Sequence, residues 1–211
     1  MKLYIYEHCP FCSRARMMFG LKNIPVELSV VMEGDSETPL RLTGKKGLPI
    51  LEKDDGTCMS ESLDIVHYSD DTYPPRLLNT PANEALMAWS KQAWSLGLKL
   101  IVPRFTRGKF GEVATDAARQ AFIAREEQHF GNLDALMAQT ATLLPPVQAQ
   151  LDTLEPLLAT PPHLTEADFH LYPVLRSLSI VKGLTFGPNT HAYMQDMARK
   201  SGVQLLADQA Q

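Results

Sequence analysis

Two of the three cysteines in this 211-residue chain lie close together, in the segment Cys9-Pro10-Phe11-Cys12. Two thiols at this spacing can bind a metal ion, or they can form and break a disulfide. A structural zinc site needs four ligands, and neither Cys58 nor the six histidines provide a second pair at a matching spacing. We therefore expect no metal at this segment and predict thiol–disulfide chemistry for Cys9 and Cys12.

Disulfide exchange requires a thiolate, because the neutral thiol is a poor nucleophile. The run Leu3–Tyr6 is typical of a buried strand, and the apolar spacing of Ser13–Leu21 is typical of a helix. A cysteine where a helix begins faces unpaired backbone N–H groups and the positive end of the helix dipole, and both stabilise its anion. We therefore predict that Cys9 is the nucleophile. Cys12, one turn inside the helix, would resolve the mixed disulfide.

Three basic side chains lie near the two cysteines in the sequence, namely His8, Arg14 and Arg16. Each would add positive potential at Cys9. However, arginines on a helix are most often solvated surface charges, and a histidine at the end of a strand usually has no chemical role. The sequence therefore assigns no function to these three residues.

Two dipeptides further along the chain have the character of ligand contacts. Leu48-Pro49 precedes a predicted strand, and because cis peptide bonds are nearly confined to X–Pro, we predict a cis bond that turns the Leu48 backbone toward a peptide ligand. Glu61-Ser62 lies where a helix is predicted to begin. The backbone N–H groups there can hold a carboxylate, and Glu61 can pair with an ammonium group. Together they suit an α-amino-acid group, such as the γ-glutamyl end of glutathione.

The remaining polar and thiol side chains are assigned more ordinary roles. Lys45 and Lys46 could reach the opposite carboxylate of such a ligand, although lysines in loops usually face solvent. Cys58 is expected to pack as a small apolar residue in a hairpin.

The elements around these residues predict an α/β domain over residues 1–72. A strand, a helix and a second strand are followed by a β-hairpin, whose turn is indicated by Asp55-Gly56, and then by another helix. This order is that of a thioredoxin-like domain. Besides the strand and helix given above, the expected elements are the strands at 26–31, 47–51 and 57–59 and the helix at 62–68.

A proline-rich linker is predicted over residues 73–81, followed by an all-helical domain over residues 82–211. Thr165 and Asp168 have the spacing of a capping box, with Leu164 placed to pack on Phe169. The expected helices cover 82–101, 114–138, 146–158, 166–182 and 189–206.

Composition limits the class of protein. The chain is 45% hydrophobic and 21% charged, and 20 basic against 24 acidic residues give a net charge of −4. Nucleic-acid binding through bulk charge is therefore not expected. No run approaches the ~20 apolar residues of a membrane span, and the N-terminal residues lack the apolar core of a signal peptide. We predict a cytoplasmic protein that does not associate with membranes.

The sequence resembles the glutaredoxin 2 family, which comprises bacterial glutaredoxins shaped like glutathione transferases. The resemblance is carried by Tyr4-Ile5-Tyr6, Cys9-Pro10-Phe11-Cys12, Leu48-Pro49, Glu61-Ser62 and the segment 164–168. It implies a glutaredoxin domain joined to a glutathione-transferase-like helical domain, with glutathione bound between them. It also implies a monomer that reduces protein disulfides and protein–glutathione mixed disulfides.

The resemblance implies roles for individual residues as well. Cys9 would attack and Cys12 would resolve. The implied glutathione contacts are Pro10, Phe11, Leu48, Pro49, Glu61 and Ser62. The family usually has tyrosine where this chain has Phe11, so any hydrogen bond from that hydroxyl is absent here.

Three alternatives remain open at this point. The chain could conjugate glutathione to electrophiles, hold an iron–sulfur cluster through Cys9 and glutathione, or bind a partner without turnover. Cys9 favours mixed disulfides over conjugation, and the proline between the cysteines disfavours a cluster.

Overall fold

A four-stranded sheet forms the centre of the first part of the chain. The computed structural model describes residues 1–160 and 163–211, and its strands are β1 (Lys2–Ile5), β2 (Glu27–Val30), β3 (Ile50–Glu52) and β4 (Cys58–Ser60). Their order in the sheet is β2-β1-β3-β4, with β1 parallel to β2 and the other two pairs antiparallel. Leu3 and Ile5 alternate with more exposed residues along β1 and are fully buried.

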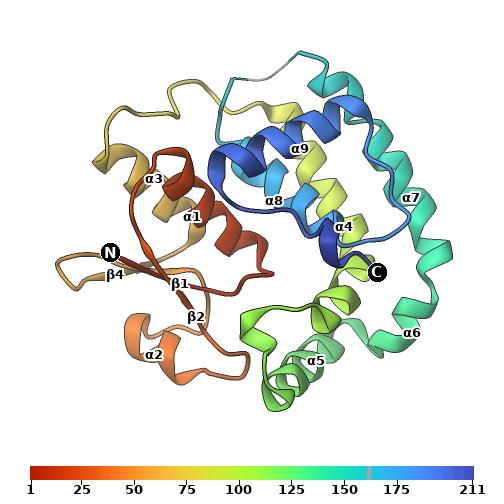
Figure 1. The fold of residues 1–211 in the computed structure, drawn as a ribbon, viewed down its shortest axis with the longest axis horizontal. Coiled ribbons are helices and arrows are strands. Elements are labelled where there is room, and N and C mark those ends of the chain that lie inside the picture. Colours follow the sequence, from red (N-terminus) through yellow and green to blue (C-terminus); the bar gives the residue numbers. More distant parts are fainter. Residues whose placement is uncertain (161–162) are drawn as a thin grey trace.

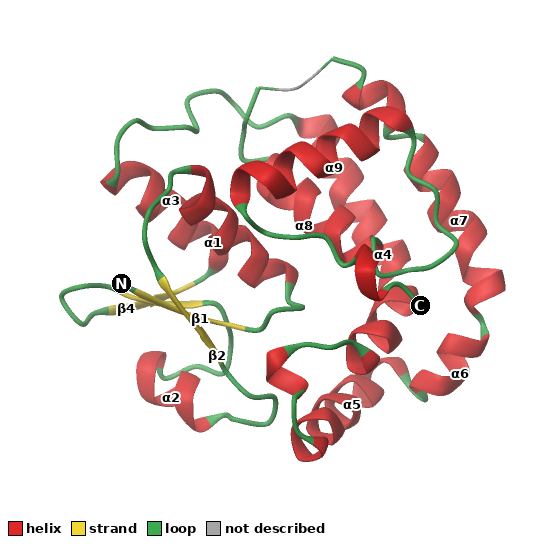
Figure 2. Cartoon of the chain, viewed as in Figure 1, coloured by secondary structure: helices red, strands yellow, loops and turns green. Residues whose placement is uncertain are grey.

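Helices cover both faces of this sheet. α1 (Pro10–Leu21) and α3 (Ser62–Thr72) lie on one face, and α2 (Glu37–Thr43) lies on the other (Figure 2). The mixed sheet and the order of elements confirm the thioredoxin-like prediction, except that α2 was not predicted. α2 is short and buries only Pro39, so it has no apolar stripe, and it ends at Gly44 in the left-handed conformation.

The rest of the chain is helical (Figure 1). Helix α5 ends at Gly131, whose φ is 72°, and Asn132 caps α6, so the helix predicted over 114–138 is in fact two helices. The α-helices are α4 (Glu84–Arg107), α5 (Asp116–Phe130), α6 (Leu133–Ala138), α7 (Thr140–Asp152), α8 (Asp168–Leu178) and α9 (Pro188–Ser201). The short 3₁₀ turns among the described residues are η1 (Gly111–Val113), η2 (Glu155–Leu158) and η3 (Ala207–Gln209).

Several predicted helix ends differ from the observed ones. α4 continues six residues beyond Ile101 despite Pro103, and α7 begins at Thr140 with two prolines inside. α8 is shorter than predicted, and it begins at Asp168. Only part of the predicted capping box is present. The Thr165 N–H donates to Asp168 Oδ2 at 2.8 Å, but the N-cap of α8 is Ala167 and not Thr165.

Helix α1 connects the two parts of the molecule. It packs against α3 on its own side and against α8 and α9 of the helical part. Met17 and Met18 of α1 share one buried cluster with Phe169 and Tyr172 of α8 and with Met197 of α9. The helix that carries the two cysteines is therefore held from both sides. α3 ends at Thr72 and α4 begins at Glu84, and the domain limits 1–72, 73–81 and 82–211 stay a prediction.

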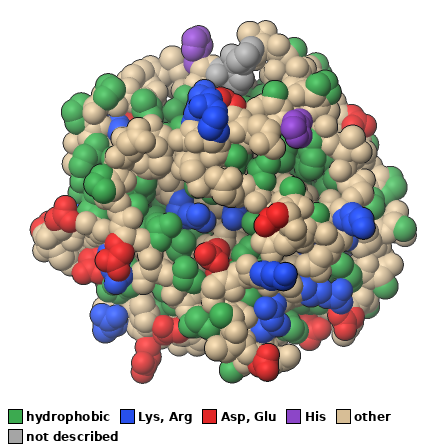
Figure 3. All heavy atoms as spheres, viewed as in Figure 1, with side chains coloured by type: hydrophobic (Ala, Val, Ile, Leu, Met, Phe, Trp, Pro, Cys, Tyr) green, Lys and Arg blue, Asp and Glu red, His purple; other side chains and the backbone are tan. Residues whose placement is uncertain are grey.

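The surface carries charges of both signs. On the face drawn in Figure 3, acidic and basic side chains both occur over much of the surface. Within residues 1–160 and 163–211, no helix combines the length and the apolar character that crossing a bilayer requires.

Candidate active site

Cys9 is the residue at which α1 begins. Its backbone is extended, with φ −65° and ψ 125°, and Pro10 occupies the first helical position, where a missing N–H costs nothing. The Cys9 Sγ accepts the backbone N–H of Cys12 at 3.5 Å. Only 9% of Cys9 is exposed, and all three cysteines are reduced thiols. The sulfur is therefore held at a helix N-terminus, as predicted from the sequence.

The surroundings of Cys9 lower the pKa of its thiol to about 6. The largest cause is a hydrogen bond from the Cys12 thiol, with further contributions from the charge of His8 and from the backbone N–H groups of Cys12 and Phe11. Burial acts in the opposite direction but does not cancel these effects. Near neutral pH the Cys9 sulfur is thus mostly a thiolate, the reactive form in disulfide exchange.

Cys12 lies behind Cys9 and is fully buried. Its Sγ accepts the backbone N–H of Tyr6 at 3.4 Å. Burial raises the pKa of Cys12 well above its usual value, and the contact with Cys9 raises it further. The two thiols therefore differ in acidity, and Cys12 keeps its proton while Cys9 is ionised.

His8, the residue before Cys9, is buried and tied to the helical part. Its Nδ1 lies 2.7 Å from Glu112 Oε1, and its backbone N–H donates to the same oxygen at 2.9 Å. The sequence alone did not assign His8 a role; in the structure the charge of His8 lowers the pKa of Cys9. Glu112 was not predicted as a site residue because it lies more than 100 positions away in no recognisable motif.

Arg14 and Arg16 are also partly buried rather than solvated as expected. Arg14 Nε donates to the carbonyl of Phe169 at 2.9 Å, and its Nη2 lies 3.0 Å from Nδ1 of His170. The Arg14 guanidinium also lies over the Phe11 ring, 4.9 Å from its centroid. Arg14 therefore joins the cysteine segment to α8.

The predicted ligand contacts come together in one cleft of about 280 Å³. The Leu48–Pro49 peptide bond is cis, as predicted. Ser62 is the first residue of α3 and is buried, and the exposed Glu61 precedes it with φ 74°. The cleft is lined by Phe11, Lys45, Lys46, Gly47, Leu48, Pro49, Ser60, Glu61 and Ser62.

A second cleft, of about 380 Å³, is also lined by Phe11. Pro10, expected as a ligand contact, lines this second cleft rather than the first. Its other walls include Arg14, Trp94 and His170. Phe11 borders both clefts and is 45% exposed, so the two clefts share one aromatic side chain of the cysteine segment.

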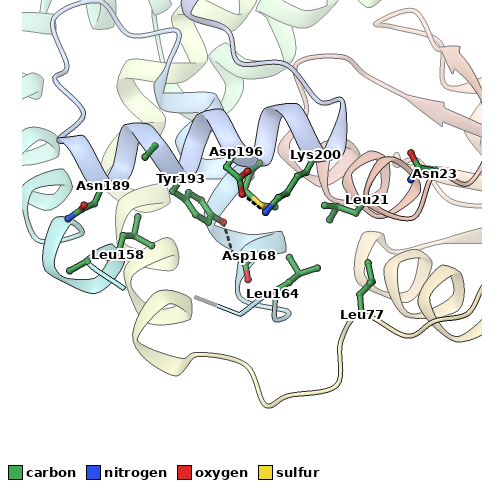
Figure 4. Close-up of a pocket in the computed structure, with 13 residues that line it drawn as sticks. Leu21, Asn23, Leu77, Leu158, Leu164, Asp168, Asn189, Tyr193, Asp196 and Lys200 are labelled. Atoms are coloured by element: carbon green, nitrogen blue, oxygen red, sulfur yellow. Dashed lines mark hydrogen bonds and ion pairs between the residues drawn. The ribbon is translucent and has the colours of Figure 1, made fainter. Parts of the chain in front are cut away.

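A larger cavity, of about 630 Å³, lies away from these clefts, against α9 (Figure 4). It contains none of the site residues predicted from the sequence. In it Tyr193 donates to Asp168 Oδ1 at 2.9 Å, and Lys200 pairs with Asp196. Volume alone therefore does not identify the reactive site.

The remaining thiol and the acidic side chains do not form a further reactive cluster. Cys58 lies half-buried on β4, and burial raises the pKa of its thiol. Across 1–160 and 163–211, no group of three or more His, Cys, Asp and Glu side chains is arranged to hold a metal ion.

The comparisons with known proteins first define the class. Residues 3–77 match the family model of the glutathione S-transferase N-terminal domain. A solved glutathione S-transferase from Sinorhizobium meliloti superimposes with a TM-score of 0.65 at 14% identity, over 99% of this chain and 97% of that one. The molecule thus has the glutathione-transferase fold, with a thioredoxin-like part followed by a helical part.

More specific relatives then define the family. Residues 85–210 match the model of the glutaredoxin 2 C-terminal domain. Glutaredoxin 2 of Escherichia coli K12 is 41% identical over the full length of both chains. Glutaredoxin 2 of Salmonella typhimurium, solved in complex with glutathione, is 42% identical, with a TM-score of 0.96 over 100% of this chain and 98% of that one. The chain belongs to the glutaredoxin 2 family.

Proposed function

We propose that this glutathione-dependent oxidoreductase works through Cys9 as the attacking thiol and Cys12 as the resolving thiol. The observation that carries the proposal is the position of Cys9 at the start of α1, where its Sγ accepts the backbone N–H of the fully buried Cys12 at 3.5 Å. The pKa of Cys9 is lowered to about 6 there, and that of Cys12 is raised. In a dithiol of this kind one cysteine is ionised and can attack, while the other keeps its proton until it resolves the mixed disulfide.

The proposed reaction begins when the Cys9 thiolate attacks one sulfur of a disulfide. In a protein–glutathione mixed disulfide, the new bond joins Cys9 to the glutathione sulfur. The protein leaves as a thiolate and takes a proton from water. A second glutathione thiolate then attacks the glutathione sulfur attached to Cys9, which releases oxidised glutathione and restores the Cys9 thiolate.

Protein disulfides require Cys12 as well. Attack by Cys9 joins it to one sulfur of the substrate and releases the other as a thiolate. Cys12 then loses its proton and attacks Cys9 Sγ, which forms the Cys9–Cys12 disulfide and frees the reduced substrate. Two molecules of glutathione reduce this disulfide and become one molecule of oxidised glutathione, so the two electrons are accounted for.

We assign glutathione to the 280 Å³ cleft beside Phe11. Ser62 offers the first backbone N–H groups of α3 to a carboxylate, and the exposed Glu61 offers a negative charge to the ammonium group. Lys45 and Lys46 are exposed, line the same cleft and suit the second carboxylate. The Salmonella relative was solved in complex with glutathione, which supports glutathione as the ligand. Pro10 borders the neighbouring cleft, which we assign to the other half of the substrate disulfide.

Two serine variants test the proposed roles. Cys9→Ser should lose reduction of both substrate types. Cys12→Ser should keep reduction of glutathionylated substrates and lose reduction of protein disulfides. A hydroxyethyl-disulfide assay and an insulin-reduction assay measure the two activities, and a chloronitroaromatic acceptor tests for conjugation. Full activity of Cys9→Ser would refute the mechanism.

The protein substrates, the oligomeric state and the location of the protein are also proposals. We propose that the substrates are disulfide-bonded and glutathionylated proteins, that the chain acts as a monomer, and that it works in the cytoplasm. A reducing compartment would keep Cys9 and Cys12 in the thiol state that the first step requires.

A further inference from the structure

The β1–α1 loop, which leads into Cys9, is bound by a segment from the helical part. This segment is η1, in the connection between α4 and α5 (Figure 1). The Gly111 N–H donates to Glu7 Oε2 at 2.6 Å, and the Glu33 N–H donates to the Glu112 carbonyl at 2.9 Å. Glu112 itself bonds both the ring and the backbone N–H of His8. The residue before the nucleophile is therefore fixed from the other part of the molecule.

Glu112 is placed where a carboxylate needs a positive partner. Its side chain is 0% exposed, and a buried carboxylate is costly unless it is paired. Oε1 accepts both bonds from His8, and Oε2 has no hydrogen-bond partner among the residues that the structure describes. His8 therefore supplies both hydrogen bonds that compensate the buried charge.

The ring of His8 is surrounded by aromatic side chains. Its centroid lies 4.7 Å from that of Phe122, 5.0 Å from that of Phe105 and 5.8 Å from that of Phe110, and it stacks on Tyr6 at 5.7 Å. Such apolar surroundings exclude water, so charges inside them interact more strongly than at the surface. A positive charge on His8 acts on the adjacent Cys9 with little screening.

Other charged groups face this pair from neighbouring elements. Arg176 of α8 is 4% exposed, and its Nη1 lies 3.5 Å from the His8 carbonyl. Glu33 is 4% exposed, but it is neutralised by a bidentate pair with Arg125 of α5. The remaining charged groups near the pair are Glu7 and Arg16. Among all of these groups, Glu112 is the one that bonds the His8 ring.

We propose that Glu112 is a positioning residue for the reaction: its buried carboxylate holds the His8 ring beside Cys9 and places a negative charge against that ring. This inference rests on the proposed role of Cys9. The charge of His8 stabilises the Cys9 thiolate, and Glu112 stabilises that charge. The helical part thereby sets the acidity of a thiol that belongs to the thioredoxin-like part.

Glu112→Gln tests the inference, because it keeps an oxygen for the His8 N–H and removes the negative charge. The pKa of Cys9 is measured from thiolate absorbance and from the rate of alkylation by iodoacetamide, with mass spectrometry to locate the label. Cys12 and Cys58 have raised pKa values and do not ionise in the same range. We expect the pKa of Cys9 to rise by about one pH unit, which slows alkylation at pH 6 roughly fivefold.

The same substitution in a His8→Asn variant distinguishes an effect that Glu112 exerts through His8 from a direct effect of the Glu112 charge on Cys9. His8→Asn keeps an amide N–H near the position of Nδ1 that can donate to the Glu112 carboxylate, but its side chain cannot become positive. The buried carboxylate therefore keeps a hydrogen-bond donor, and this variant still tests the inference if Glu112→Gln fails to fold. His8→Asn alone should raise the pKa of Cys9, and adding Glu112→Gln should raise it no further. An unchanged pKa in Glu112→Gln, or in His8→Asn, would overturn the inference. The inference would also be overturned if Glu112→Gln raised the pKa of Cys9 equally in the wild type and in His8→Asn.

Failure of the inference about Glu112 can be told apart from failure of the proposed mechanism. Loss of reductase activity in Cys9→Ser supports the role of Cys9 whatever Glu112→Gln does. If the pKa of Cys9 is unchanged in Glu112→Gln while Cys9→Ser is inactive, only the role of Glu112 is refuted.

Discussion

The Cys12 thiol donates a hydrogen bond to the Cys9 sulfur, and this contact lowers the pKa of Cys9 while it raises that of Cys12. Cys12, the proposed resolving residue, is thus also the main stabiliser of the Cys9 thiolate. The sequence pointed to the helix N-terminus as the source of the acidity, and the backbone N–H groups do contribute. The Cys12 thiol lowers the pKa of Cys9 more than these N–H groups do.

The pH dependence of the first chemical step follows from this pairing. With a pKa of about 6, Cys9 is mostly neutral at pH 5 and mostly a thiolate at pH 7, so alkylation should be about tenfold faster at pH 7. The rate should level off above pH 7.5. Alkylation with iodoacetamide at a series of pH values measures this profile. A rate that still climbs through pH 8.5, as for an ordinary cysteine, would contradict the prediction.

Glu61 should contribute to glutathione binding through its charge. It is exposed, and an exposed ion pair contributes at most about 1 kcal/mol. Glu61→Gln should therefore raise the KM for glutathione about two- to fivefold and leave kcat nearly unchanged. Asp64→Asn is a matched control, because Asp64 lies in the first turn of the same helix outside the cleft. Equal effects of the two variants would argue against the assigned contact.

Asp70 should be essential for stability. It is 1% exposed and accepts bonds from Lys22 Nζ at 2.7 Å and from the backbone N–H groups of Leu77 and Leu78. Asp70→Ala leaves a buried lysine without its counter-charge and should cost about 3–5 kcal/mol. Asp71→Ala removes an exposed pair with Arg76 and should cost less than about 1 kcal/mol. Urea unfolding measures both, and similar costs would refute the prediction.

The same carboxylate gives stability a defined pH dependence. Burial alone would raise the pKa of Asp70, but its bonds to Lys22, Leu77 and Leu78 lower it below 3.8 overall. Because the folded state binds this proton more weakly than the unfolded state, the stabilisation is complete well above pH 4 and is lost as the pH falls below that value. Urea unfolding at pH 3 and pH 7 should show a smaller gap between the wild type and Asp70→Ala at pH 3.

Gly20 should not tolerate a side chain. A Cβ at this position would lie 1.8 Å from the Ser201 carbonyl oxygen, which is backbone and cannot turn away. Gly20→Ala gains about 1 kcal/mol of helix propensity, but separating α1 from α9 should cost more, about 1–3 kcal/mol. We expect a Tm several degrees lower. Gly47→Ala is the control, because a Cβ there meets nothing within 4 Å; a Tm for Gly20→Ala at or above that of the wild type would contradict the prediction.

Local features were predictable wherever the residues that decide them are neighbours in the chain. The strand before Cys9, the helix after it, the cis Leu48–Pro49 bond and the Thr165–Asp168 contact were all expected, and all are present. α2 was missed because it buries only Pro39 and so shows no helical pattern.

By itself, the sequence determined that two cysteines lie where a strand meets a helix, and that the second part of the chain is helical. Only the tertiary structure decided what surrounds that dithiol: Glu112 on His8, the Phe169 carbonyl on Arg14, and the Ser201 backbone on Gly20. Propensity, capping and turn chemistry act within a few residues, so their traces remain in the sequence. Contacts between residues more than 100 positions apart depend on how whole helices pack, and no local pattern records them.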